Sequence, residues 1–379
     1  MPTHSRTPDL PNSRLSFHSS CQVSSTEVLR GVLNRYKFSH YSMGTIFSIT
    51  AYGASSTCVE QIARQAFQEV DRLNNLMSRY RPNSELSMLN REALGRSVVL
   101  TPELFDVLKE SLHLSVETDG AFDITVGQLM RSWGFFQGNE HVPSQAELKD
   151  LLRRTGYRHV ELNAAKRSIQ FDEPGIELDL GAIGKGYAVD RVAEILRRKE
   201  LDCALISSGM SSIYALGAPP GESGWGISIC DPHDRRKKAC SLQLRDLSVS
   251  ISGTHEKSFA QNGKMYTHIL HPGSGSPADT MLMSVVITDS STMSDALSTA
   301  FFVAGPELGR TYLANHSDTA AIFYVRNGFS ASFDEITLHS NTAPLPQERF
   351  SQSRISTTTL RGASCAIPML KEERWRGCA

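Results

Sequence analysis

Two oxygen-bearing side chains stand four residues apart in the segment 294–300, which reads SDALSTA. Asp295 and Thr299 fall on a predicted helix, where this spacing places both side chains on one face. A carboxylate and a hydroxyl, completed by carbonyl oxygens and water, form a donor set that suits a hard cation such as Mg²⁺. The structural alternative is that Thr299 bonds back to its own helix and Asp295 merely favours the first turn. The spacing alone leaves both interpretations open.

A second segment, 177–190, reads ELDLGAIGKGYAVD and contains three glycines and Lys185. It runs from a predicted strand into a helix expected to begin at Tyr187. Glycines let the backbone approach a phosphate, a lysine adds positive charge, and a helix start offers free N–H groups. The segment matches neither of the two standard nucleotide-binding loops. It therefore indicates either a phosphate-bearing ligand or a tight strand-to-helix turn.

Two further sites are candidates for contact with a ligand or for proton transfer. Residues 121–123 (Ala-Phe-Asp) follow a predicted helix end, where a loop could present an aromatic face and a carboxylate to a flat heterocycle. The alternative is a core phenylalanine beside a turn aspartate. His268 lies at the end of a predicted strand, before a Pro/Gly turn, and is placed to act as a general base near neutral pH. The alternative is a structural histidine.

Composition excludes several classes of function. The 379 residues include 39 Lys+Arg and 40 Asp+Glu, so a net charge of −1 gives no general field to hold nucleic acid or an anionic membrane. No apolar run approaches the roughly 18 residues of a transmembrane helix. The seven cysteines are odd in number and lack a C-x-x-C pair, which indicates reduced thiols rather than a disulfide framework or zinc site. The basic run 235–238 is interpreted as a solvated hairpin loop.

The chain divides into three predicted parts. Residues 1–36 are rich in Ser, Pro and Arg and are expected to be a flexible N-terminal extension. Because they lack the apolar block of an export signal, the sequence as written predicts a cytoplasmic location, with the cell envelope or periplasm as the alternative if the true start differs. Residues 37–345 form the predicted folded domain, and 346–379 a C-terminal tail.

Helical and strand-like segments are mixed within residues 37–345. Apolar spacings of three and four predict helices over 58–80, 102–118, 147–154, 187–199 and 292–303. Strands are expected at 44–53, 159–163, 168–172, 176–181, 203–209, 212–217, 225–231, 241–253, 266–272 and 281–289, and a hairpin across Asn327-Gly328. Strict βαβ alternation is absent, so the pattern favours an α+β fold with mainly antiparallel sheets and packed helices.

Seven sequence blocks, taken in order, resemble the ApbE family of FAD:protein FMN transferases, or flavin transferases. The blocks are MGT (43–45), SRYRPNSELSMLN (78–90), GAFDITV (120–126), LDLGAIGKGYAVD (178–190), SISG (250–253), HILHP (268–272) and DALSTA (295–300). The resemblance spans roughly residues 40–310 and implies a single ApbE-like catalytic domain related to the T-fold.

The resemblance also implies roles for individual residues. Mg²⁺ would be bound by Asp295 and Thr299, with main-chain oxygens from Ala182 and Ser298. His268 matches the histidine proposed to deprotonate the acceptor hydroxyl. Positions that match FAD-binding residues are Met43, Tyr80, Ala121, Phe122, Asp123, Asp179, Lys185 and Ile269.

The implied reaction is transfer of FMN from FAD, with Mg²⁺ as cofactor, to a Thr or Ser hydroxyl of an acceptor flavoprotein, with release of AMP. An acceptor motif of the type D-G-x-[ST]-[SG]-A-[ST] is expected on the partner and does not occur in this chain. The alternatives are FAD hydrolysis to FMN and AMP, and a non-catalytic protein that binds or carries FAD.

The sequence departs from the family pattern at three places. His271 stands where the family usually has Asp, Ser208–Ser211 replaces a Gly-Gly-Asp-like turn, and His255 replaces a common tyrosine. These departures concern the positioning of the substrate; the Asp295–Thr299 pair is intact.

Overall fold

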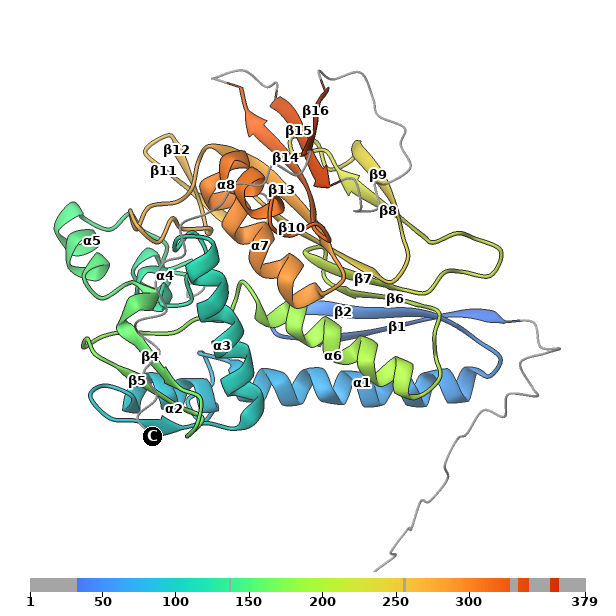
Figure 1. The fold of residues 1–379 in the computed structure, drawn as a ribbon, viewed down its shortest axis with the longest axis horizontal. Helices are drawn as coiled ribbons and strands as arrows, with labels where there is room; N and C mark the ends of the chain where they lie inside the picture. Colours follow the sequence, from blue (N-terminus) through green and yellow to red (C-terminus); the bar gives the residue numbers. More distant parts are fainter. Residues whose placement is uncertain (1–32, 136–137, 255–256, 328–332, 341–354, 361–379) are drawn as a thin grey trace, which may run out of the picture.

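A nine-stranded sheet forms the centre of the fold in the computed structural model, which describes residues 33–135, 138–254, 257–327, 333–340 and the backbone of 355–360 (Figure 1). Its strands follow the order β1 (Asn34–Ser42), β2 (Thr45–Gly53), β6 (Ala204–Ser208), β7 (Ser212–Leu216), β10 (Leu247–Gly253), β13 (Met281–Thr288), β14 (Ala320–Arg326), β15 (Phe333–Ser340) and β16 (Ile355–Leu360). Neighbouring strands are antiparallel except for the last pair. The predicted α+β class with mainly antiparallel sheets is confirmed.

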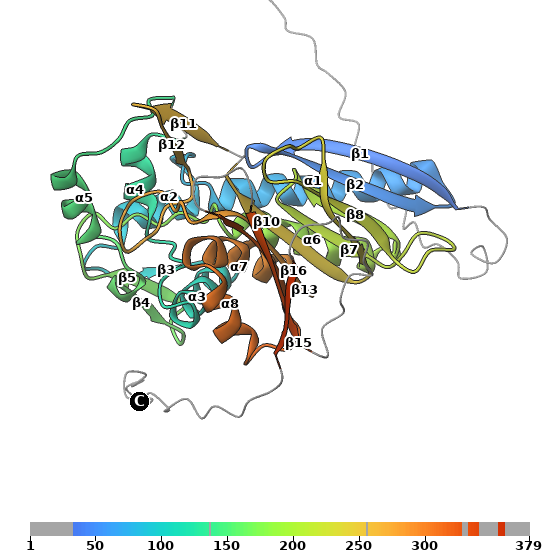
Figure 2. The same cartoon turned by 90° about the horizontal axis from the view of Figure 1, so that it is seen from above.

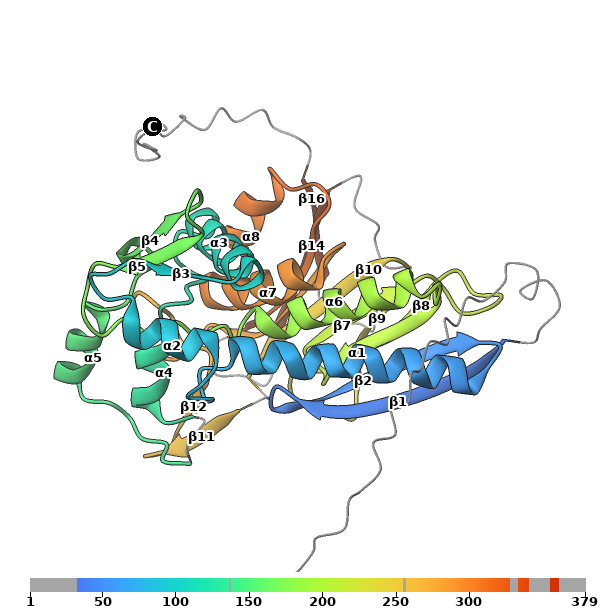
Figure 3. The same ribbon diagram turned by 90° about the horizontal axis from the view of Figure 1, so that it is seen from below.

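Helices cover one face of this sheet, and a β-hairpin covers part of the other. Figures 1 and 3 show α1 (Ser56–Met77), α6 (Gly184–Arg198) and α7 (Ser291–Ala304) side by side along the sheet. The hairpin of β8 (Trp225–Cys230) and β9 (Lys238–Leu244) packs on the opposite face. Because β13 lies between the two layers, all eight of its residues are buried.

A smaller lobe packs at the end of the sheet (Figure 2). It contains α2 (Glu85–Glu92), β3 (Val98–Val99), α3 (Pro102–Glu117), α4 (Gly127–Trp133), α5 (Gln145–Leu152), the 3₁₀ helix Tyr157–His159, β4 (Val160–Asn163) and β5 (Ser168–Phe171). Trp133 centres a small core with Phe259 and Tyr266 of the hairpin β11 (Ser258–Gln261) and β12 (Lys264–Thr267). Helix α8 (Pro306–Leu313) follows α7.

The structure differs from the sequence-based expectations in several places. The expected strand 176–181 is irregular backbone with one isolated bridge, Val126 to Glu177. The expected strand 266–272 ends at Thr267, and 241–253 is divided between β9 and β10. The sheet also extends past the predicted domain limits, since β1 begins at Asn34 and β16 covers Ile355–Leu360.

Two other expectations concern particular features of the chain. The hairpin β14–β15 forms as expected, although its Gly328 lies outside the described residues. No disulfide joins any two of the four described cysteines, and none of the described helices combines the length and apolarity needed to cross a bilayer.

Helices α6 and α7 are tied together by a carboxylate and by a glycine. Asp190 of α6 accepts four hydrogen bonds at the start of α7: from the Ser291 and Thr292 N–H groups at 2.7 and 2.8 Å, and from the Ser290 and Thr292 hydroxyls at 2.9 and 2.7 Å. Asp190 therefore caps α7 from a neighbouring helix, and its negative charge interacts favourably with the positive end of the α7 dipole. Gly186 allows the close approach, because a Cβ there would lie 2.1 Å from the Ser291 carbonyl oxygen.

The cap predicts a stability effect larger than that of an ordinary helix cap. Asp190→Ala should lower the free energy of unfolding by about 2 kcal/mol or more, since a hydrogen bond to a charged group is worth roughly 1.5–3 kcal/mol. Ser144→Ala, which removes the single Ser144 cap of α5, should cost about 1 kcal/mol. Urea unfolding of both variants tests this. If both variants lost the same free energy of unfolding, Asp190 would contribute no more than an ordinary local cap.

Candidate functional site

One large cleft gathers nearly all the residues predicted to be functional. Its volume is about 1250 Å³, and its walls come from the β1–β2 turn, the end of α1, the 121–126 loop, the 179–185 turn, the end of β8 with the loop that follows it, residues 268–272 and α7. Among the predicted site residues, only Ser298 does not line the cleft, because it is fully buried.

An oxygen cluster lies where α6 meets α7. The Asp295 side chain is 4% exposed, and its Oδ2 accepts the Gly186 N–H at 2.9 Å while its Oδ1 accepts the Ser212 hydroxyl at 3.0 Å. The Gly186 N–H would otherwise point to the carbonyl of Ala182, four residues earlier. Among the described backbone groups, no N–H donates to that carbonyl. Asp295 thus holds one donor on each oxygen and leaves the Ala182 oxygen available.

Thr299 and Ser298 complete this wall in different ways. The Thr299 hydroxyl is 3.4 Å from the Asp295 carbonyl and 3.3 Å from the Ser252 hydroxyl, so the predicted bond back to its own helix is present but long. Thr299 also faces the cleft. The Ser298 carbonyl accepts the Ser284 hydroxyl and does not reach the cleft, so it is less available to a cation than the other predicted donors.

His268 is held in a neutral form suited to accept a proton. The backbone nitrogen of His268 lies 3.1 Å from the Lys257 carbonyl oxygen, and the ring Nδ1 lies 3.2 Å from the same oxygen, which can only accept a hydrogen bond. For Nδ1 to hydrogen-bond to this carbonyl it must carry the proton of the neutral ring. The lone pair is then on Nε2. Burial lowers the pKa of His268 to about 4, and the charges of Lys185 and Lys257 act in the same direction.

The glycine-rich turn is organised by its own polar side chains. Asp179 accepts the Gly181 N–H at 2.8 Å, and the Lys185 ammonium donates to the Gly181 carbonyl at 2.9 Å. These two bonds hold residues 179–185 in one conformation, in which Ala182 and Lys185 line the cleft. Both proposed functions of this segment, ligand binding and a tight strand-to-helix connection, remain compatible with this geometry, although the strand itself is absent.

Arg79 is a cleft residue that the sequence did not single out. Its side chain is 4% exposed; Nε lies 2.8 Å from Asp179, Nη1 lies 3.2 Å from Glu177, and Nη2 donates to the Tyr80 hydroxyl at 2.9 Å. Burial opposes the positive charge, but the carboxylates outweigh it and raise the pKa of Arg79. Arg131 also pairs with Glu177 at 2.6 Å. The network fixes the exposed Tyr80 ring beside the 176–180 segment.

The side chains of Phe122 and Asp123 make contacts within the protein, whereas a ligand-presenting loop would expose them to the cleft. Phe122 is 2% exposed and belongs to the main core. Asp123 accepts the Thr125 N–H and hydroxyl at 2.8 and 2.7 Å and the Tyr157 N–H at 2.8 Å, while burial raises its pKa. These contacts match the alternative of a core phenylalanine beside a turn aspartate, although all three residues border the cleft.

Met43 is presented at the tip of the β1–β2 hairpin. Met43 and Gly44 have φ values of 49° and 75°, as a two-residue type I′ turn requires. Asp71 of α1 pins the end of β1, accepting the Ser42 hydroxyl at 2.8 Å and the His40 Nε2–H at 2.9 Å. Ile269, next to His268, is buried and lines the cleft.

Two of the three departures from the family pattern have a structural account. The His271 Nδ1 accepts the Gly273 N–H at 3.1 Å, which is the bond that an aspartate makes in an Asx turn. In the 208–211 turn, Gly209 has φ 60° and donates to the Ile46 carbonyl at 2.8 Å, so the turn is docked on β2. His255 lies outside the described residues.

Comparisons with known proteins agree on one family. The sequence profile of the ApbE family matches residues 43–323. An FAD:protein FMN transferase of Treponema pallidum is 31% identical over 78% of this chain and 85% of its own length. One from Klebsiella pneumoniae is 33% identical over 77% and 90%.

Solved structures of this family have the same fold. The flavin transferase ApbE from Vibrio cholerae has a TM-score of 0.71 at 27% identity and covers 81% of this chain and 97% of that one. The ApbE protein of Thermotoga maritima has a TM-score of 0.71 at 28% identity, covering 77% and 94%. The chain therefore belongs to the ApbE family and is an enzyme of the transferase class that acts on phosphorus-containing groups.

Proposed function

We propose that this enzyme transfers FMN from FAD to a Thr or Ser hydroxyl of an acceptor flavoprotein, in a Mg²⁺-dependent reaction that releases AMP. The observation that carries the proposal is that one cleft contains both His268 and the Ala182, Asp295 and Thr299 oxygen cluster. The name shared by the relatives supports the class of reaction. At about 1250 Å³ the cleft is larger than the roughly 300–1,000 Å³ of most small-molecule sites, which leaves room for a dinucleotide substrate.

The oxygen cluster fits Mg²⁺. Its donors are a carbonyl to which no described backbone N–H donates, a carboxylate with one hydrogen bond on each oxygen, and a hydroxyl, and such oxygen donors are those that Mg²⁺ prefers. Ala182, Asp295 and Thr299 would hold the ion, whereas the Ser298 carbonyl, which accepts the Ser284 hydroxyl and does not line the cleft, is less available to it. When bound, Mg²⁺ would neutralise charge on the phosphoryl oxygens and improve AMP as a leaving group.

His268 supplies the base in this scheme. Its Nε2 takes the proton of the acceptor hydroxyl, whose oxygen then forms a bond to the phosphorus on the FMN side of FAD. The bond from that phosphorus to the bridging oxygen breaks, and AMP leaves with the bridging oxygen. Lys185 is close enough to His268 to affect its pKa, so its ammonium charge is also placed to attract the pyrophosphate.

The remaining predicted residues would hold the two ends of FAD. Met43, Tyr80, Asp179 and Ile269 contribute side chains from four separate parts of the cleft wall. Tyr80 is held by Arg79 with its ring exposed, which leaves an aromatic face for a flat heterocycle. Positioning by these groups, rather than a covalent enzyme intermediate, would supply most of the rate enhancement.

A single assay tests the function. Purified enzyme is mixed with FAD and Mg²⁺, with and without a carrier protein bearing a D-G-x-T-S-A-T tag, and AMP release and the intact mass of the carrier are followed. The proposal expects a Mg²⁺-dependent mass gain of one FMN with stoichiometric AMP. AMP without a mass gain would indicate FAD hydrolysis, and tight FAD binding with neither product would indicate a flavin carrier.

Asp295→Ala tests the metal assignment. The variant should lose Mg²⁺-dependent turnover by on the order of 100-fold or more, because a bound ion contributes several kcal/mol of charge stabilisation. Asp231→Ala is the matched control, since Asp231 also lines the cleft but lies on the β8–β9 side. It should keep the metal dependence. Unchanged AMP release in Asp295→Ala would contradict the assignment.

The pH dependence tests His268. A lowered pKa keeps the imidazole neutral above about pH 4, so the base is lost only as the pH falls through that value. The acid limb of kcat/KM for FAD, which reports the free enzyme, should therefore lie near pH 4 and not near the ordinary histidine value of about 6.5. His268→Gln should lower the rate by roughly 10²–10⁴-fold and remove that limb. An acid limb near pH 6.5 that persists in His268→Gln would exclude His268 as the base.

A further inference from the structure

Three exposed apolar side chains meet at one edge of the cleft mouth. Tyr41, Ile46 and Met210 are 70%, 58% and 54% exposed. Tyr41 and Ile46 are cross-strand partners at the end of the β1–β2 hairpin and share one face of the sheet. The bond from the Gly209 N–H to the Ile46 carbonyl brings Met210 beside them. Together these three residues form what is termed here the mouth patch.

Positive charge flanks the mouth patch. Arg35 and Lys37 are exposed and lie on the same face of β1 as Tyr41, because side chains alternate along a strand. The Arg235 guanidinium lies 2.8 Å from the Met210 sulfur. Within the part of the chain that the structure describes, none of these three cations forms an ion pair, whereas the adjacent Arg236 pairs with Asp234 at 2.9 Å. An acidic partner would satisfy them.

We propose that the mouth patch and its three cations form the docking surface for the acceptor protein, and that the acceptor presents apolar and acidic residues around the modified hydroxyl. The proposal rests on the proposed function. Tyr41 and Met210 line the same cleft as His268 and Asp295, so a protein whose hydroxyl reaches the reacting phosphorus must cover the rim of that cleft. Exposed Tyr, Met and Arg are the residues enriched at protein interfaces.

The proposal gives a function to one departure from the family pattern. The 208–211 turn carries Met210 where the family resemblance leads us to expect an acidic Gly-Gly-Asp-like turn. The substitution adds apolar surface and leaves Arg235 without a carboxylate beside it in that turn. The docking surface of this chain is therefore suited to its own acceptor.

Charge reversal on both partners tests the proposal. Two peptides carry the same D-G-A-T-S-A-T core, one flanked by Leu and Glu residues and the other by Leu and Lys residues. Wild-type enzyme should bind the Glu-flanked peptide at least tenfold more tightly, and Arg35→Glu/Lys37→Glu should abolish or reverse that preference. Met210→Ser and Tyr41→Ser should each weaken binding of both peptides several-fold. The affinity for FAD should change by less than twofold in all of these variants.

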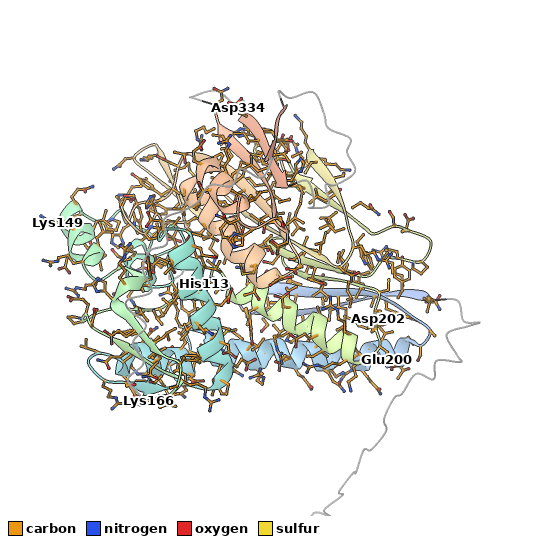
Figure 4. The ribbon with its side chains drawn as sticks, in the orientation of Figure 1. His113, Lys149, Lys166, Glu200, Asp202 and Asp334 are labelled. Atoms are coloured by element: carbon orange, nitrogen blue, oxygen red, sulfur yellow. The ribbon has the colours of Figure 1, made fainter. Side chains whose placement is uncertain are left out.

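Matched controls lie outside the lining of the cleft. Val99 and Val116 are exposed to 71% and 62% and do not line it, so Val99→Ser and Val116→Ser should bind both peptides as wild type does. Lys149 and Lys166 project from the smaller lobe (Figure 4), and Lys149→Glu/Lys166→Glu controls for net charge. Equal peptide affinities for wild type and the mouth variants would overturn the proposal. Loss of FAD affinity in those variants would instead place the patch in the flavin site.

The two proposals can fail separately. Peptide binding is measured directly by fluorescence anisotropy and does not require transfer. Binding that depends on the patch without FMN transfer would keep the docking surface and reject the transferase. FMN transfer that is insensitive to every patch variant would keep the transferase and reject the docking surface.

Discussion

The contact between the Gly186 N–H and the Asp295 carboxylate is the constraint on which the site depends. A helix normally uses that N–H to close its first turn on the residue four positions earlier. Here the donor bonds to Asp295 of α7, so within the described backbone no N–H donates to the Ala182 carbonyl, and α6 and α7 lie close together. A glycine is necessary at this position, since any Cβ would collide with α7. The oxygen cluster is therefore a product of helix packing, already arranged before a ligand binds.

Hydroxyl groups fix the position of α7 on the sheet. Most of its residues are buried, so apolar packing alone would tolerate small shifts along or around the helix axis. A buried row of serines from β10 and α7 instead makes directional bonds of 2.8–2.9 Å, as in Ser248–Ser294, Ser250–Ser294, Ser252–Ser298 and Ser291–Ser248. Small side chains also allow the helix to approach the sheet closely. Together with the Asp190 cap, this network sets where Asp295 and Thr299 face.

Local periodicity predicted the long helices and most strands because their buried faces follow the 3.6 and 2.0 repeats. It failed at 176–181, where Glu177 and Asp179 alternate with apolar residues as in a half-exposed strand. These carboxylates are held by Arg79, about 100 residues earlier in the sequence, and not by solvent. The four-residue spacing also placed Asp295 and Thr299 on one face of a helix, and both line the cleft. The contributions of Gly186, Arg79 and Asp71 depend on tertiary contacts between distant segments, and no local pattern indicates them.

The net charge of the chain did not predict the positive charge that surrounds His268. The net charge of −1 excluded a general polyanion-binding surface, yet two lysines lie close to His268: burial lowers the pKa of its imidazole, and the charges of Lys185 and Lys257 lower it further. The same charges favour an anionic substrate, so one part of the pKa shift, beside the larger effect of burial, has the same origin as the attraction for substrate. A bound pyrophosphate would offset the lysines and raise the basicity of His268. In the proposed reaction, His268 would therefore be a weak base in the empty cleft and a stronger one when FAD is in place, which would link proton abstraction to substrate binding.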